Sequence, residues 1–136
     1  MTKSNRVVIV DDNEDITSVI SDILEIGGFN VVGIGHDGKE AVSLYKKHKP
    51  DFIFLDVTMP IMNGIQALKE IKEEDSKANV IMVTADDGTG VIQELKKLNA
   101  TAIIVKPLKL KQSLKQSKTL TSKIEKEIKD ENNFKT

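Results

Sequence analysis

A chain of 136 residues with 39% hydrophobic and 30% charged residues is long enough for one domain with a buried core and too short for a second. It contains no cysteine, which excludes disulfides, thiolate metal sites and cysteine nucleophiles. No apolar run is long enough to span a bilayer and no signal peptide is recognisable, so we expect a cytoplasmic protein without membrane contact.

Charge is unevenly distributed along the chain. Residues 1–105 carry 11 Lys/Arg and 17 Asp/Glu, a net charge of −6, whereas residues 106–136 carry 9 and 4, a net charge of +5. The basic tail has no arginine and a single aromatic residue, Phe134. A basic segment of this kind does not predict nucleic-acid binding.

Short apolar runs, typical of buried strands, alternate with stretches in which apolar residues recur at helical spacing. Turn and cap residues such as Asp11-Asp12-Asn13 and Gly27-Gly28 separate them. In chain order, the predicted elements are a strand at Val7–Val10, a helix marked by Ile16 to Leu24, a strand at Phe29–Ile34, a helix marked by Ala41 to Tyr45, a strand at Phe52–Leu55, a helix marked by Ile65 to Ile71, a strand at Val80–Val83, a helix marked by Val91 to Leu98, a strand at Ala102–Val105 and a helical stretch from about Leu108.

Five β-α units of this kind predict one α/β fold. Strands this apolar need cover on both faces, which is typical of a parallel sheet. Right-handed crossovers then give a doubly wound, flavodoxin-like sandwich with strand order 2-1-3-4-5 and five helices. Ligands of such folds bind beyond the carboxyl ends of the strands, so the residues there are the first candidates for a site.

Five polar residues stand at these carboxyl ends: Asp11, Asp12, Asp56, Thr84 and Lys106. Considered alone, each has an ordinary explanation, and Asp11 and Asp12 can simply belong to a helix cap. Together, the three carboxylates repel one another unless a cation neutralises them, and hard oxygen ligands suit Mg2+. A carboxylate beside a metal can attack phosphorus and form an acyl phosphate, while Thr84 and Lys106 can hydrogen-bond phosphoryl oxygens. The alternative is an acidic patch without a ligand.

The sequence resembles the response-regulator receiver family over about residues 5–120. Five motifs carry the resemblance, and any one of them alone is weak. They are Asp11-Asp12 after the first strand, Leu55-Asp56 at the end of the third, the loop Met59-Pro60-Ile61-Met62-Asn63-Gly64, Thr84-Ala85 after the fourth strand and Lys106-Pro107 after the fifth.

The resemblance implies a role for each candidate residue. Asp56 is then the phospho-acceptor, and Mg2+ is held directly by Asp12, Asp56 and the backbone carbonyl of Thr58. Asp11 acts on the metal through a bound water. Thr84 is the switch hydroxyl and Lys106 the phosphoryl-binding lysine.

The function implied is that of a single-domain response regulator. Asp56 receives a phosphoryl group from a sensor histidine kinase or a histidine phosphotransfer protein. A protein effector then binds the face formed by the fourth helix, fifth strand and fifth helix, through which a weak dimer can also form. We expect a receiver at 1–120, a basic helical extension at 121–136, no output domain and no catalysis beyond the domain's own phosphorylation and dephosphorylation.

One departure from the family pattern leaves an alternative function open. The family usually has an aromatic residue three positions before the lysine, where this chain has Ile103. The chain can therefore also be a phosphate carrier or sink in a phosphorelay, without an effector switch.

Other patterns in the chain have competing interpretations. Gly33-Ile34-Gly35-His36-Asp37-Gly38 matches a dinucleotide-binding fingerprint, but Asp37 would repel the pyrophosphate. A phosphatase of the haloacid dehalogenase class needs a second acid at position 58, where Thr58 stands. We expect both histidines, His36 and His48, at the solvated surface. Residues 121–136 are either a frayed helix or a docking helix.

Overall fold

In the computed structural model, residues 5–59, 61–84 and 89–105 are described. Strands and helices alternate through these ranges, as the sequence predicts. In chain order they are β1 Arg6–Val10, α1 Glu14–Ile26, β2 Asn30–Gly35, α2 Gly38–His48, β3 Phe52–Asp56, α3 Gly64–Glu74, β4 Val80–Thr84, α4 Thr89–Lys97 and β5 Ala102–Val105. The predicted fifth helix and the predicted extension at 121–136 lie outside the described residues.

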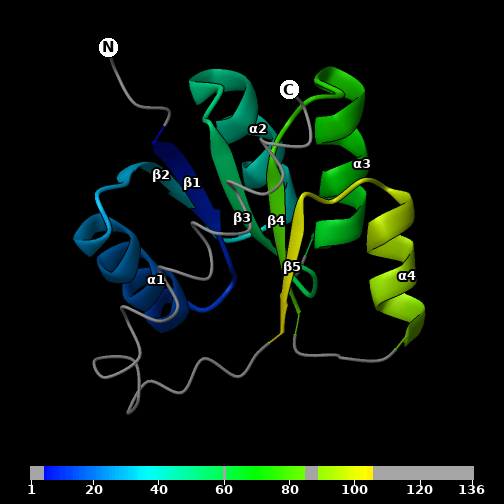
Figure 1. Ribbon diagram of the computed structural model, residues 1–136, viewed down its shortest axis with the longest axis horizontal. Coiled ribbons are helices and arrows are strands. Elements are labelled where there is room, and N and C mark those ends of the chain that lie inside the picture. Colours follow the sequence, from blue (N-terminus) through cyan, green and yellow to red (C-terminus); the bar gives the residue numbers. More distant parts are fainter. Residues whose placement is uncertain (1–4, 60, 85–88, 106–136) are drawn as a thin grey trace.

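The five strands form one sheet in the order β2-β1-β3-β4-β5, and every pairing is parallel. The predicted doubly wound topology is therefore confirmed. The arrowheads in Figure 1 point in one direction, so all carboxyl ends of the strands lie at the same edge of the sheet. β3 occupies the centre of the order, and its residues are buried along its whole length.

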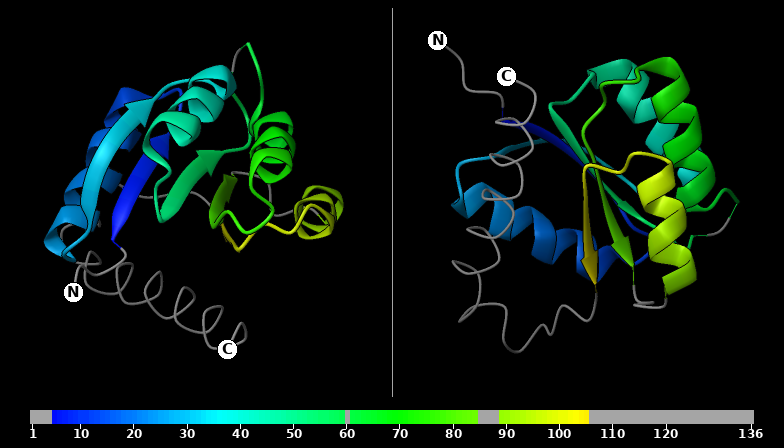
Figure 2. Two further views of the ribbon diagram at one scale, coloured as in Figure 1. Left: turned by 90° about the horizontal axis from the view of Figure 1, so that it is seen from above. Right: turned by 45° about the vertical axis from the view of Figure 1, so that its right-hand side comes forward.

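Helices cover both faces of the sheet, α1 on one and α2, α3 and α4 on the other (Figure 2). Because successive side chains of a strand point to opposite faces, the apolar run of β1 divides between two cores. Val8 and Val10 pack with residues of α2 and α3, whereas Val7 and Ile9 pack with residues of α1. This division explains why the strand is apolar throughout rather than alternating.

Polar side chains fix where α1, α2 and α3 begin. Asn13 caps α1, its side chain accepting hydrogen bonds from the backbone N–H groups of Asp15 and Ile16. Asp37 caps α2 and Asn63 caps α3 in the same way. Such caps satisfy N–H groups that have no partner inside the helix. At the other end of α1, Gly28 has φ +91°, a conformation that glycine adopts without strain.

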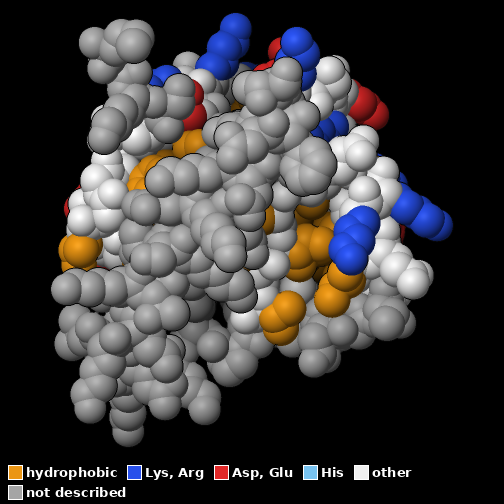
Figure 3. Space-filling view, viewed as in Figure 1, with side chains coloured by type: hydrophobic (Ala, Val, Ile, Leu, Met, Phe, Trp, Pro, Cys, Tyr) orange, Lys and Arg blue, Asp and Glu red, His pale blue; other side chains and the backbone are white. Residues whose placement is uncertain are grey.

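The two edge strands carry the exposed apolar side chains of the sheet. Ile34 of β2 is 42% exposed and Val105 of β5 is 43% exposed. Figure 3 shows hydrophobic side chains at the surface along β5 and toward α4. In the part of the chain that the structure describes, no helix has the length and apolar character needed to cross a membrane.

Candidate functional site

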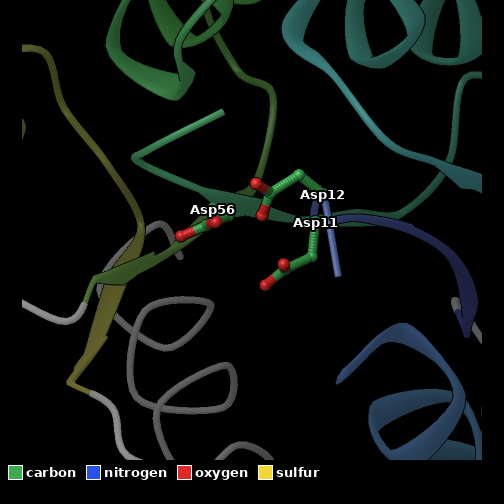
Figure 4. Close-up of side chains that lie close together, drawn as sticks. All are labelled: Asp11, Asp12 and Asp56. Atoms are coloured by element: carbon green, nitrogen blue, oxygen red, sulfur yellow. The ribbon is translucent and has the colours of Figure 1, made fainter. Parts of the chain in front are cut away.

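Three acids converge at the carboxyl edge of the sheet. The last residue pair in the register of β1 and β3 is Val10 with Leu55, so Asp11 and Asp56 follow on adjacent strands. One carboxylate oxygen from each of Asp11, Asp12 and Asp56 lies within 4.8 Å of the other two. Figure 4 shows the three side chains pointing toward one another, Asp11 and Asp12 from the end of β1 and Asp56 from the end of β3.

Burial makes this convergence costly without a positive charge nearby. Asp11 is 2% exposed and Asp56 is 5% exposed, whereas Asp12 is exposed to solvent. Buried carboxylates at such a separation repel one another unless a cation or protein donors stabilise them. Three oxygen ligands, two of them sheltered, form a donor set that suits a hard divalent cation. The residues present therefore fit a magnesium ion.

Asp11 also has a structural role. Its Oδ1 accepts a hydrogen bond of 3.0 Å from the backbone N–H of Asn13, which in turn caps α1. The expected helix-capping role of this acidic turn and its role in a site are thus compatible. Asp11 shapes the turn with one carboxylate oxygen while its side chain faces Asp56.

Thr84 lies at the end of the neighbouring strand. Val83 of β4 is paired with Asp56, and Thr84, the next residue, is 2% exposed. The backbone N–H of Val57 donates to the carbonyl of Val83 over 3.0 Å, which ties the residue after Asp56 to β4. Thr84 pairs with Val105, the residue before Lys106 in the sequence. Lys106 itself lies outside the described residues.

The loop after Asp56 is tightly folded. The carbonyl of Val57 accepts a 2.8 Å hydrogen bond from the N–H of Gly64, while Thr58, the next residue, is exposed. Ile61 has φ +67° and a side chain that is 78% exposed. A β-branched residue in the left-handed region is costly, so the surrounding contacts must impose this conformation.

Gly64 contributes to the site in a way that its sequence pattern did not reveal. It is the first residue of α3, and a Cβ atom added there would overlap the carbonyl oxygen of Asp56. The Asn63-Gly64 pair signals a helix start from the sequence alone. Its second role, a close approach to the backbone of Asp56, depends on a contact between residues eight positions apart.

The expectation that both histidines are solvated is wrong. His36 and His48 are each half-buried. His36 Nδ1 lies 3.1 Å from the carbonyl oxygen of Asp11, and the His48 ring packs near Gly33. Their polar sequence neighbours concealed these contacts, because both partners are distant in the sequence.

The glycine fingerprint between β2 and α2 packs against protein groups. A Cβ atom at Gly33 or Gly35 would approach the side chain of Leu44 to 3.1 and 3.0 Å, and one at Gly38 would overlap the carbonyl of Met62. Asp37 caps α2 and places a carboxylate where a dinucleotide phosphate would sit. Helix packing and a loop contact therefore account for these glycines.

A second polar cluster lies at the amino ends of β3 and β4, at the opposite edge of the sheet. The hydroxyl of Tyr45 donates a 2.8 Å hydrogen bond to Asp75, beside a cavity of about 250 Å³ that Asp51 and Lys77 also line. Burial and the neighbouring Asp75 raise the pKa of Tyr45, and the same hydrogen bond lowers the pKa of Asp75. This pair joins α2 to the turn after α3.

Comparisons with known proteins agree with this geometry. The family model of the response regulator receiver domain matches residues 7–118. The chemotaxis protein CheY of Bacillus subtilis is 42% identical over 104 residues, which cover 76% of this chain and 87% of that protein. CheY of Thermotoga maritima is 42% identical over 102 residues, which cover 75% and 85%.

Solved structures show the same likeness. The response regulator domain of Thermotoga maritima CheB is 32% identical with a TM-score of 0.80, covering 93% of this chain and 98% of that one. CheY in a CheX-CheY-BeF3-Mg2+ complex from Borrelia burgdorferi is 36% identical with a TM-score of 0.75, covering 85% and 88%. The chain therefore belongs to the response-regulator receiver family, and its place is in two-component signalling.

Proposed function

We propose that this chain is a single-domain response regulator that accepts a phosphoryl group on Asp56 with Mg2+ bound. The donor is a phosphohistidine of a sensor histidine kinase or of a histidine phosphotransfer protein. One observation carries the proposal: one carboxylate oxygen from each of Asp11, Asp12 and Asp56 lies within 4.8 Å of the other two, in a chain of the receiver family.

The metal ligands follow from this arrangement and from the family pattern. Asp12 and Asp56 would hold Mg2+ directly, together with the backbone carbonyl of Thr58, and Asp11 would hold it through a water. The neighbouring carbonyl of Val57 is already bonded to Gly64, so Thr58 offers the next carbonyl in this loop. When bound, Mg2+ neutralises these carboxylates and the oxygens of the incoming phosphoryl group.

Asp56 is the nucleophile of the transfer. One of its carboxylate oxygens forms a bond to phosphorus while the bond from phosphorus to the donor imidazole breaks, and that electron pair returns to the imidazole nitrogen. The burial of Asp56, which is 5% exposed, limits access of water to the new acyl phosphate. The hydroxyl of Thr84 and the ammonium group of Lys106 donate hydrogen bonds to phosphoryl oxygens.

The output is a change in which protein the domain binds. Phosphorylation replaces the single negative charge of the Asp56 carboxylate by a phosphoryl group that carries about two, and this group draws Thr84 toward it. This shifts the population between two conformations that exist beforehand. The effector binds the face of α4, β5 and the predicted fifth helix, where Val105 is 43% exposed and Ile103 is half-buried. The same face would support a weak dimer of an otherwise monomeric, cytoplasmic protein.

A second candidate function is that of a phosphate carrier or sink. Ile103 favours it, because an aliphatic side chain that packs on the core beside α4 cannot report phosphorylation by an aromatic rotamer change. The two functions differ in one measurement, the affinity of an effector for phosphorylated and unphosphorylated protein. A carrier shows no difference between the two forms and transfers its phosphoryl group onward. In neither case do we expect turnover of a separate small substrate.

The primary test is intact mass after incubation with Mg2+ and acetyl phosphate. Wild type should gain about 80 Da, the mass of one phosphoryl group, and chelation of Mg2+ should abolish the gain. Asp56→Asn should gain nothing. Asp22→Asn, which changes an exposed acid on α1 away from the site, is the matched control and should behave as wild type.

Two outcomes would contradict the proposal. A gain of equal size in Asp56→Asn would place the modification on another residue. Wild type that accepts no phosphoryl group from acetyl phosphate, and none from a phosphorylated histidine kinase of a related chemotaxis system, would leave only a binding module that works without phosphorylation.

A further inference from the structure

The short segment between β2 and α2, residues 35–38, contacts both halves of the acidic site. This segment is the part of the glycine fingerprint that the proposed function does not use. One of its ends meets the backbone of Asp11, and the other meets the loop that follows Asp56. The contacts are made by backbone groups and by a single side chain.

The first end holds both backbone polar groups of Asp11. The N–H of Asp11 donates to the carbonyl of Gly35 over 3.1 Å, and His36 Nδ1 lies 3.1 Å from the carbonyl oxygen of Asp11. A carbonyl oxygen only accepts hydrogen bonds, so Nδ1 must carry the proton in this contact. The half-buried His36 ring therefore anchors the residue whose side chain enters the acid cluster.

The second end reaches the loop after Asp56. The N–H of Gly38 donates to the carbonyl of Met62 over 2.9 Å, and Gly38 is buried. A Cβ atom at this position would overlap the Met62 carbonyl, so only glycine permits the contact. Met62 precedes Asn63 and Gly64, and Gly64 lies against the backbone of Asp56. Residues 35–38 are thus connected to Asp56 by a short series of backbone contacts.

We propose that residues 35–38 are a brace that sets the distance between the acid pair Asp11-Asp12 and Asp56, with His36 as a positioning residue. This inference rests on the proposed function, because it concerns the same metal site. Three carboxylates that repel one another drift apart unless their backbones are held. The sheet register holds Asp11 beside Asp56 on one side, and the brace holds both from the side of α2.

Asp37 is the part of the brace that caps α2. Its Oδ1 accepts a 2.8 Å hydrogen bond from the N–H of Glu40 and caps α2. The acid of this segment is therefore engaged as a cap, and His36 is its only side chain shown in contact with the acid pair. Because Asp37 and His36 have separate roles, His36 can be changed in a test without disturbing the cap of α2.

The experiment compares His36→Phe with His36→Asn. Phe keeps a planar ring of similar size but has no donor, whereas the amide nitrogen of Asn can occupy the place of Nδ1. Calorimetric titration with Mg2+ alone measures affinity, acetyl phosphate at saturating Mg2+ measures the phosphorylation rate, and urea unfolding measures stability. His48→Phe, at the other histidine of the chain, is the matched control.

We expect His36→Phe to weaken Mg2+ binding by about 10-fold, the effect typical of losing a partner that orients a metal ligand. His36→Asn should restore most of this affinity, and His48→Phe should leave it unchanged. Gly38→Ala should also slow phosphorylation at saturating Mg2+, because it displaces the loop after Asp56.

The outcomes separate this inference from the proposed function. Unchanged Mg2+ affinity in a folded His36→Phe protein refutes the brace. Equal losses in His36→Phe and His36→Asn also refute it, since they show that the ring only fills space. Wild type that binds no Mg2+ refutes the proposed function, and the brace with it.

Discussion

Substitution of Gly64 by alanine would show how rigidly the backbone holds Asp56. The added Cβ would overlap the carbonyl oxygen of Asp56 and lie 2.9 Å from the Cα of Val57. Both obstacles are backbone atoms, and β3 is the central strand of the sheet. Neither atom can give way as a flexible side chain would, so the strand end or the start of α3 must shift.

The magnitude follows from two opposing effects. Replacing glycine by alanine in a helix gains up to about 1 kcal/mol, because alanine loses less backbone entropy on folding. Overpacking in a tight interior costs about 1–3 kcal/mol. Because the added Cβ of Gly64→Ala would clash with backbone atoms, we expect a cost at the upper end of this range. We therefore expect Gly64→Ala to lower the free energy of unfolding by about 2 kcal/mol.

Two other glycines provide controls. Gly90, in the first turn of α4, has open space where a Cβ would lie, so Gly90→Ala should raise the free energy of unfolding by about 0.5–1 kcal/mol. Gly28 also has open space, but its φ of +91° makes an L-residue strained, so alanine there should cost about 1–2 kcal/mol. The three substitutions thus separate steric overlap, backbone strain and helix propensity.

Urea unfolding without Mg2+ measures the stability of each variant, and Mg2+ titration measures the state of the site. Stability should fall in the order Gly90→Ala, wild type, Gly28→Ala, Gly64→Ala. Only Gly64→Ala should also weaken Mg2+ binding. If Gly64→Ala matched Gly90→Ala in stability and wild type in Mg2+ affinity, the close contact would not be what positions Asp56.

Three further predictions concern charge and hydrogen bonding. Asp12→Asn should relieve the repulsion among the three acids, so without Mg2+ its thermal unfolding midpoint should equal or exceed that of wild type. Saturating Mg2+ should stabilise only wild type, by about 2.7 kcal/mol at a concentration 100 times Kd. Tyr45→Phe should cost about 1 kcal/mol at neutral pH, because the hydrogen bond that lowers the pKa of Asp75 is lost. Chemical denaturation across pH should show this deficit shrinking as pH falls below about 4, because Asp75 is protonated as pH passes through its lowered pKa. The deficit should also shrink above about pH 10, because the raised pKa of Tyr45 makes wild type lose stability there. Asn13→Ala should cost about 1 kcal/mol in the same denaturation assay, because α1 loses its cap.

The sequence was sufficient to predict the fold and the meeting of the three acids. Apolar strands of four to six residues, separated by helices with clear caps, admit few topologies once crossovers are right-handed. A parallel sheet then brings every strand's carboxyl end to one edge. Asp11 and Asp56 meet there because β1 and β3 are neighbours in the order and in register.

The contacts that shape the site could not be predicted in the same way. His36 contacts the backbone of a residue 25 positions away, and Gly38 contacts Met62, 24 positions away. These contacts depend on the length and path of two loops, which leave no periodic signal in the sequence. A glycine pattern indicates that something approaches the backbone closely, but it does not distinguish a phosphate from a carbonyl.

The charges of the three acids and the backbone contacts that position them (here called the frame) are separate properties of this site. Each can be altered without the other. Without a bound cation the acids repel one another, so backbone contacts must hold them together before the metal binds. Replacing an acid by its amide changes the charge and leaves the frame nearly intact, because the amide occupies the same space. Replacing Gly38 or Gly64 changes the frame and leaves every charge in place. A site held only by its ligands would lose Mg2+ affinity in the first case alone, whereas one held by backbone contacts loses it in both.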